Sequence, residues 1–334
     1  MKEIVEESSK HINNNHIQND KSKEKKTKNL IQFYKNEISE QEIQYLIQLK
    51  ELCASKQLEY RFDLYNDYII LRLLRSKKYN IQETFKLFQE YINFTTKYQA
   101  FNLDKVQFPN FDKIRLFYPH GFHKTTKEGN PVFIQNLGEC KISDINRILP
   151  EPLLTQYILY KINEVEKIIF PSCSEKFDKK INQIYCVVDL LGLTTSLMNK
   201  QIVEFINKLI KVCSIYYPGI MESLIFVNTS LVFRGIWTPC KYFYESETRE
   251  KIKLLGFDYK EELLKSIELE NLPKFFGGMC NCSPYGCLYS NIGPWNEPES
   301  KGDKRRKTNY LEKLNNIKKE KKDDEDDDDI INDD

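Results

Sequence analysis

The sequence lacks the short motifs that mark the common enzyme classes. It contains no GxGxxG or GxxxxGKS/T phosphate loop, no GxSxG nucleophile elbow and no HExxH zinc motif. Cys173 and Cys213 are not followed by the arginine that a cysteine-phosphatase loop requires. Only four histidines are present, and two of these, His120 and His123, are expected to flank a surface turn. We therefore predict that the protein is not an enzyme.

Long apolar runs are also missing. The longest are interrupted by Asp189, Asn228 or Arg234, well short of the roughly 20 residues that span a bilayer. The first residues, MKEIVEESSKHINNN, contain no apolar stretch, so we expect no secretory signal. The nine cysteines show no paired spacing, which favours free thiols in a reducing compartment over a disulfide framework. These absences predict a cytoplasmic protein.

Neither sign of charge dominates, although charges gather in blocks. The chain has 50 lysines and arginines against 49 acidic residues, which predicts no nucleic-acid partner. Residues 1–35 are rich in Asn, Lys and Glu, whereas residues 299–334 place a basic block, Lys304 to Lys307, before an acidic run, Asp323 to Asp329. Both segments are predicted to be disordered because they bury little apolar surface. The basic block is also compatible with contact to anionic lipid or with a nuclear signal.

Between these arms, residues 36–107 carry three helical patterns. Ser39 and Glu42 have the spacing of a capping box, a second helix is predicted over residues 66–76, and Asn80 precedes a third. In the third, Ile81, Phe85 and Phe88 recur at helical spacing. The region is therefore predicted to be an all-α three-helix bundle.

Residues 108–298 alternate strand and helix patterns. Strands are predicted over residues 131–138, 185–189, 224–227 and 251–256. One helix is predicted to open at Pro152 and to end at Pro171, and another covers residues 201–216. Such alternation is typical of an α/β lobe with helices packed on a largely parallel sheet.

Large apolar side chains crowd between the last two predicted strands. Gly235 and Pro239 are expected to break the helix that this segment would otherwise form. A hinged cover of this kind suits an apolar cavity that opens at intervals, and ordinary core packing is the alternative. The predicted gate consists of Phe233, Gly235, Ile236, Trp237, Pro239, Phe243 and Tyr244.

Eight blocks of sequence, in order, resemble one protein family. They are LLRSKKYNI (73–81), FHKTTKEGNPVFIQNLG (122–138), VVDLLGLTTS (187–196), YYP (216–218), Asn228 with Phe233 and Trp237, TREKI (248–252), LP-FFGG (272–278) and GCLYSNIGPW (286–295). Through them the chain resembles the CRAL-TRIO lipid-binding domain, specifically its phosphatidylinositol/phosphatidylcholine transfer branch. The resemblance implies that the α/β lobe, residues 108–298, encloses a lipid cavity.

The resemblance also implies where a lipid headgroup is held. It assigns Lys77, Lys78 and Lys251 to an inositol phosphate, since a phosphate removed from water needs charge-assisted partners. Taken alone, the two lysines after LLRS read as cations that oppose a helix dipole. Gly219 stands where the family often has a glutamate that holds the inositol ring, and Glu222 is a candidate substitute.

A second headgroup set is implied for choline phosphate. Thr194 and Ser196 match hydroxyl positions of the transfer branch, although both also suit helix capping. Phe122 and Phe133 stand where the family has tyrosines that contact choline, and an aromatic face still attracts a quaternary ammonium.

Three cysteines form the best metal candidate in the sequence. Cys280, Cys282 and Cys287 are close together, but zinc usually needs a fourth ligand and no histidine follows. We interpret them as free thiols in a C-terminal loop, with structural zinc as the alternative, and expect no metal or cofactor.

The predicted function is binding of phospholipid as cargo and transfer of phosphatidylinositol, phosphatidylcholine or both between membranes by gated exchange. The expected partners are phospholipids and a transient membrane surface, with the protein a monomer. The alternative is a lipid sensor or adaptor that presents phosphatidylinositol to a phosphoinositide kinase or another partner. A phosphoinositide hydrolase is disfavoured because no nucleophile–base pair is recognisable.

Overall fold

The computed structural model describes residues 38–61, 64–108, 111–193, 200–240, 249–283 and 286–296. Both predicted arms, residues 1–35 and 299–334, lie outside the described residues. The chain divides after Lys97 into two compact units. The sequence-based boundary at residue 107 stays a prediction.

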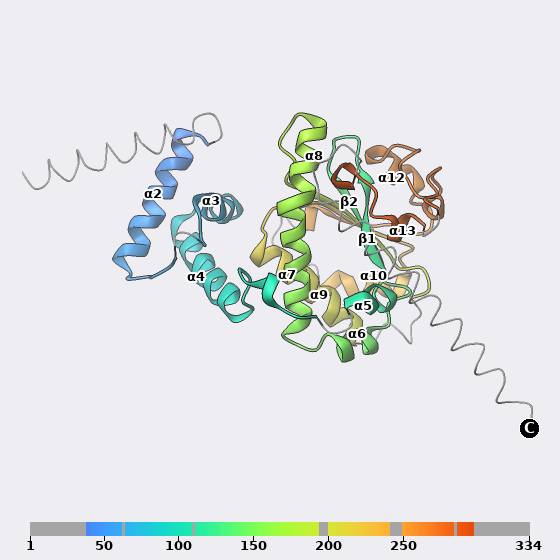
Figure 1. Ribbon diagram of the computed structural model, residues 1–334, viewed down its shortest axis with the longest axis horizontal. Helices are drawn as coiled ribbons and strands as arrows, with labels where there is room; N and C mark the ends of the chain where they lie inside the picture. The colour runs from blue at the N-terminus through green and yellow to red at the C-terminus, as the bar shows by residue number, and fades with distance from the viewer. Residues whose placement is uncertain are drawn as a thin grey trace, which may run out of the picture. The chain divides into compact units, whose positions relative to one another are not determined.

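In the first unit, the described residues form the helices α2 (Glu40–Ser55), α3 (Asp67–Ser76) and α4 (Ile81–Lys97) (Figure 1). The predicted capping box at α2 is confirmed: the Ser39 hydroxyl accepts a bond from the Glu42 backbone, and the Glu42 carboxylate accepts one from the Ser39 backbone. Asn66 and Asn80 cap α3 and α4 through their side-chain oxygens. The helices bury one apolar stripe each, including Leu46, Leu49, Leu73, Leu74, Phe88 and Tyr91.

The second unit is organised around a five-stranded sheet. Its strands are β1 (His120–Thr125), β2 (Pro131–Asn136), β3 (Ile184–Asp189), β4 (Met221–Val227) and β5 (Ile252–Leu254), in the spatial order β1-β2-β3-β4-β5. The β1–β2 pair is antiparallel, and the other three pairs of this sheet are parallel. The prediction of a largely parallel sheet in an α/β lobe is therefore confirmed.

Helices and short turns precede, connect and follow the strands. Their bounds are α5 (Phe111–Phe117), α6 (Ile142–Ile148), α7 (Leu153–Glu164), α8 (Phe170–Phe177), α9 (Lys200–Tyr216), α10 (Leu231–Cys240), α12 (Lys260–Ser266) and α13 (Cys287–Ser290), with 3-10 turns η1 (Leu103–Lys105), η4 (Lys274–Phe276) and η5 (Pro294–Asn296).

The helix predicted to end at Pro171 continues past it. A π-helical turn, Val165–Ile169, joins α7 to α8, so that they form one long rod in Figure 1. Pro171 lies in the first turn of α8, and the π turn before it absorbs the change of hydrogen-bonding pattern that a proline imposes. The predicted stop is therefore wrong.

One face of the sheet forms a filled core. Alternate residues of β2, β3 and β4 point to this face, because successive side chains of a strand point to opposite sides. They pack against α12 and the turn that follows it. The buried cluster consists of Val132, Ile134, Tyr185, Val187, Ile225, Val227, Leu263, Ile267, Leu272 and Phe276.

The prediction that His120 and His123 flank a surface turn is wrong. Both lie in β1, and their side chains are 2% and 1% exposed. The helix α13 covers this strand at close range: a Cβ on Gly121 would approach the Leu288 carbonyl oxygen to 2.2 Å. A sequence as polar as HGFHKT is thus buried by a segment that lies far away in the chain.

An ion pair in the first unit gives a testable pH dependence. Glu42 Oε1 accepts hydrogen bonds from Arg75 Nε (2.8 Å) and from the Tyr79 hydroxyl (2.8 Å). The hydrogen bond from Arg75 is the main reason that the pKa of Glu42 falls from 4.5 to about 2. Because the folded pKa is the lower one, the stabilisation is present above about pH 4.5 and is lost as pH falls towards 2.

We therefore expect Glu42→Gln to lower the free energy of local unfolding of α2 and α3 at pH 7. The loss should be only about 1 kcal/mol, because solvent screens a pair that is partly exposed. It should shrink as pH falls towards 2. Amide hydrogen exchange of the full chain measures both quantities, with Glu90→Gln on the exposed side of α4 as the control. Equal protection in Glu42→Gln and the unsubstituted protein at pH 7 would contradict the assignment.

Candidate functional site

The second face of the sheet is hollow. The strand residues that alternate with those of the filled core line a cavity, and they include Phe133, Cys186, Val188 and Phe226. The same alternation that fills one face of the sheet therefore leaves apolar side chains facing a space on the other.

Helices α7 and α9 supply the other walls of this cavity. Their side chains that line it include Ile158, Ile162, Ile206, Leu209 and Ile210. The helical spacing of these apolar residues directs one stripe of each helix towards the sheet. The cavity is thus enclosed by the sheet on one side and by two amphipathic helices on the other.

Tyr118, His120, Gln135 and Tyr157 place polar atoms in the cavity wall, and these atoms are hydrogen-bonded. The Tyr118 hydroxyl bonds to Gln135 Oε1, and Gln135 Nε2 donates to Cys186 Sγ (3.1 Å). His120 bonds through Nδ1 to the Tyr118 carbonyl oxygen (2.6 Å) and through Nε2 to the Tyr157 hydroxyl (3.1 Å). Burial lowers the pKa of His120 well below its usual value and raises the pKa of Tyr118 well above its own. Both side chains are therefore uncharged at neutral pH.

Lys161 is the one cationic side chain among the described residues that line the cavity, and it pairs with Glu164. No local sequence motif predicts the His120–Tyr157 and Tyr118–Gln135 contacts. One sequence feature does indicate a shared face: Phe133 and Gln135 are two residues apart in a predicted strand, so their side chains point to the same side.

The cavity is small in this conformation. Its volume is about 120 Å³, whereas pockets for drug-sized ligands measure about 300–1,000 Å³. A larger apolar ligand therefore requires the walls to move apart.

The helix α10 adjoins the cavity through an aromatic cluster. The ring centroids of Phe233 and Trp237 lie 5.5 and 5.4 Å from that of Phe226, which lines the cavity. The predicted break at Gly235 and Pro239 is wrong, since α10 runs continuously from Leu231 to Cys240. Pro239 nevertheless lacks the backbone N–H that would donate a helical hydrogen bond to the Gly235 carbonyl oxygen.

Other predicted gate positions are described only in part. The side chains of Ile236 and Pro239 lie outside the described residues, as do Phe243 and Tyr244 entirely.

The start of α10 is fastened to the ends of the neighbouring strands. Asn228 Nδ2 donates to Asp189 Oδ1 (2.7 Å), and the Thr229 hydroxyl donates to the Leu255 carbonyl oxygen (2.6 Å). Ser230 Oγ caps the helix by accepting from the Phe233 backbone (3.1 Å). Any displacement of α10 therefore begins beyond these residues.

Exposed apolar side chains gather at the same edge of the sheet. β3, β4 and β5 are parallel and end there in register, with Asp189 beside Val227 and Phe226 beside Leu254. The segments that follow these three strands expose Leu191 (58%), Leu231 (84%), Val232 (47%) and Phe257 (75%).

The predicted headgroup residues fall in several places. Phe122 and Phe133 both line the cavity, with ring centroids 4.7 Å apart. Thr194 and Ser196 lie outside the described residues. Lys77 and Lys78 follow α3 in the first unit, whereas Lys251 precedes β5 in the second, so the inositol-phosphate set stays a prediction.

The residues considered for the inositol ring both lie near the start of β4. Gly219 is exposed and has a positive φ of 80°. Glu222 is half-buried, and its Oε2 accepts a hydrogen bond from Asn130 Nδ2 (2.8 Å). Burial raises the pKa of Glu222. Its carboxylate is thus already engaged by the turn between β1 and β2.

Comparison with known proteins identifies the family. The model of the CRAL/TRIO domain matches residues 118–278. The phosphatidylinositol/phosphatidylcholine transfer protein SFH11 of Arabidopsis thaliana is 34% identical over 71% of this chain and 64% of its own length. The chain therefore contains a CRAL/TRIO domain, at residues 118–278. The resemblance inferred from the eight sequence blocks is confirmed.

Two further relatives of this CRAL/TRIO protein extend the match. The phosphatidylinositol/phosphatidylcholine transfer protein SFH7 of Arabidopsis thaliana is 33% identical over 70% of this chain and 43% of its own length. The Sec14 cytosolic factor of Schizosaccharomyces pombe is 28% identical over 70% of this chain and 82% of its own length. The chain thus spans less than two thirds of the two Arabidopsis relatives. None of these three proteins is named as an enzyme.

A solved structure titled "Crystal structure of Sfh5" aligns with a TM-score of 0.46 and 16% identity, over 60% of this chain and 68% of that one. Within the described part of the CRAL/TRIO chain, no helix has both the length and the apolar character needed to cross a membrane.

Proposed function

We propose that the CRAL/TRIO domain binds one phospholipid and carries phosphatidylinositol, phosphatidylcholine or both between membranes. The observation that supports this most is the apolar cavity between the sheet and helices α7 and α9. The names of the Arabidopsis relatives point to the same two lipids. No covalent bond is made or broken in such a reaction.

The free energy of the acyl chains explains why a cavity is needed. Some thirty methylenes, at about 0.8 kcal/mol each, favour an apolar environment over water by roughly 25 kcal/mol. A lipid exchanges quickly only if the protein offers surroundings nearly as apolar as the bilayer. The net free energy of transfer is then small, and the opening of the cavity limits the rate.

The opening is proposed to involve α10 at a membrane surface. A cavity of about 120 Å³ is too small for two acyl chains, so exchange requires α10 and the neighbouring wall to move outward. The exposed apolar residues at the carboxyl edge of the sheet, Leu231 and Phe257 among them, are suited to contact the bilayer meanwhile. We propose a cytoplasmic protein that visits membranes transiently.

The headgroup assignments remain part of the proposal. Lys77, Lys78 and Lys251 would bind the inositol phosphate by charge-assisted hydrogen bonds. Thr194 and Ser196 would bind the choline phosphate, with Phe122 and Phe133 near the quaternary ammonium.

The cavity is tested by filling it. Leu209→Trp adds volume to the wall on α9, and we expect it to weaken phospholipid binding by about 1–3 kcal/mol, roughly 5- to 150-fold. Transfer of labelled phosphatidylcholine between vesicles measures the effect. Lys211→Trp, on the exposed side of α9, is the control. Equal transfer by the two variants would overturn the proposed function.

The proposed membrane contact at the carboxyl edge of the sheet is tested by substituting one of two exposed phenylalanines. Phe257→Asp should weaken vesicle binding about 10-fold, because burial of a phenylalanine contributes about 1.5–3 kcal/mol. Phe275→Asp, which changes an exposed phenylalanine in the turn η4, should have little effect. Vesicle co-sedimentation gives both values. Comparable losses in both variants would argue against this edge as the contact.

The inositol-phosphate set is tested by a double substitution. Lys77→Ala with Lys251→Ala should reduce transfer of phosphatidylinositol more than that of phosphatidylcholine, because two cations are removed from the phosphate. Lys86→Ala with Lys105→Ala makes the same change in net charge at exposed positions. If transfer of the two lipids falls equally in the first variant, the headgroup assignment is wrong.

A further inference from the structure

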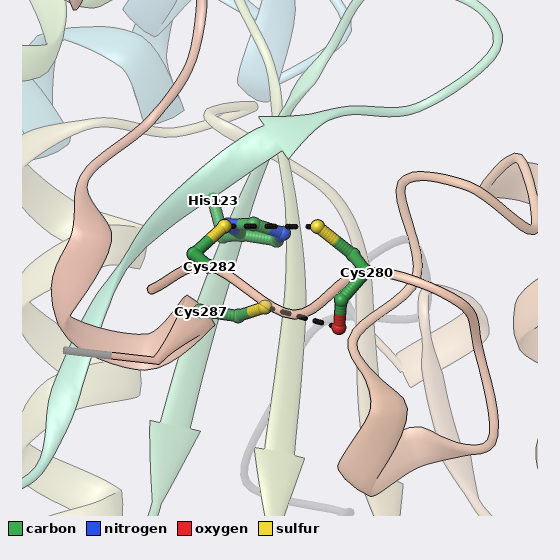
Figure 2. A group of neighbouring side chains, drawn as sticks. All are labelled: His123, Cys280, Cys282 and Cys287. Atoms are coloured by element: carbon green, nitrogen blue, oxygen red, sulfur yellow. Dashed lines mark hydrogen bonds between the residues drawn. The ribbon is translucent and has the colours of Figure 1, made fainter. Parts of the chain in front are cut away.

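Four potential metal ligands meet on a part of the CRAL/TRIO chain that does not line the cavity. Cys280, Cys282 and Cys287 come from the C-terminal segment, and His123 comes from β1 (Figure 2). The ligand atoms of all four lie within 4.8 Å of one another. The histidine that does not follow the cysteines in the sequence is therefore supplied by a distant strand.

The spacing of these atoms fits a tetrahedral site. Sulfur ligands at about 2.3 Å from a tetrahedral zinc are about 3.8 Å apart. Cys280 Sγ and Cys282 Sγ are 3.6 Å apart. Cys287 Sγ lies 3.4 Å from the Cys280 carbonyl oxygen, within the same small cluster.

The imidazole of His123 has a ring nitrogen available. Ser290 Oγ donates its proton to the Cys287 carbonyl oxygen (3.0 Å), so it accepts from His123 Nδ1 (3.3 Å). This contact places the proton on Nδ1 and leaves a lone pair on Nε2. Among the described residues, His123 Nε2 is buried without a hydrogen-bond partner. A metal ion would satisfy an atom that is otherwise costly to bury.

The backbone holds the ligands in place. Cys280 N donates to the Leu272 carbonyl oxygen (3.0 Å), and Gly286 N donates to that of Cys282 (2.6 Å). Lys124 N, next to His123, donates to the Ile292 carbonyl oxygen (2.6 Å). The first two bonds hold the cysteines within the C-terminal segment, and the third joins this segment to β1 beside His123.

We propose that His123, Cys280, Cys282 and Cys287 bind one zinc ion. Three sulfurs and one imidazole nitrogen favour zinc over magnesium or calcium, which prefer oxygen ligands. Four protein ligands leave no open position, so the ion is structural. It would tie the C-terminal segment to β1.

The metal content of the full chain tests the proposal. Protein expressed with added zinc and purified under reducing conditions should contain about one zinc ion per chain, as measured by elemental mass spectrometry. Cys282→Ser should lower zinc affinity at least about 10-fold. Cys173→Ala, which removes a buried thiol outside the cluster, should leave the zinc content unchanged.

Cobalt substitution provides a readout that does not depend on the variants folding. Cobalt added to the metal-free protein should give the visible absorption of a tetrahedral thiolate complex. Absence of both zinc and this spectrum would overturn the proposal, as would a Cys280–Cys282 disulfide found by peptide mass spectrometry in the freshly purified protein. Lipid transfer is not used as a readout, so the result is independent of the proposed function.

Discussion

The structure depends on one constraint, the alternation of side chains along the strands of a sheet that is covered on both faces. In β3, Tyr185 and Val187 enter a filled core, while Cys186 and Val188 face the cavity. The hydrophobic effect buries both sets, but only one face is packed to completion. The filled face holds the sheet together and so allows the other face to remain partly empty.

The polar groups near the cavity are arranged so that they do not oppose an apolar ligand. Tyr118, Gln135 and His120 satisfy one another or the backbone, which removes the cost of burying them. At the edge of the sheet, Asp189 and Asn228 fix the start of α10. These bonds hold the first residues of α10, and Pro239 lies near its other end. Movement of α10 would then involve the part between them, where Phe233 and Trp237 pack on Phe226.

Local sequence patterns predict the secondary-structure elements that depend on interactions between residues close together in the chain. The caps at Ser39 and Asn80 and the buried strands β3 and β4 are predictable because each has a strong short-range signal. β1 is not predictable in this way because its burial depends on α13, far along the chain. The sequence also does not predict that α10 continues through Gly235, because packing on Phe226 outweighs the weak helix propensity of glycine.

The candidate sites likewise contain residues that the sequence predicts and residues that only distant contacts bring together. The sequence blocks identify the family and place Phe122, Phe133, Phe233 and Trp237 at or beside the cavity. The grouping of His123 with three cysteines cannot be predicted from spacing, because it arises from the contact of β1 with a remote segment.

The central claim is that the hollow face of the sheet accommodates a lipid. Native mass spectrometry of the purified full chain tests it most directly. We expect a mass increase of one phospholipid per chain, and a smaller lipid-bound fraction in Leu209→Trp, in which the larger side chain fills part of the cavity. A protein that carries no lipid, even after incubation with vesicles of phosphatidylinositol and phosphatidylcholine, would contradict it.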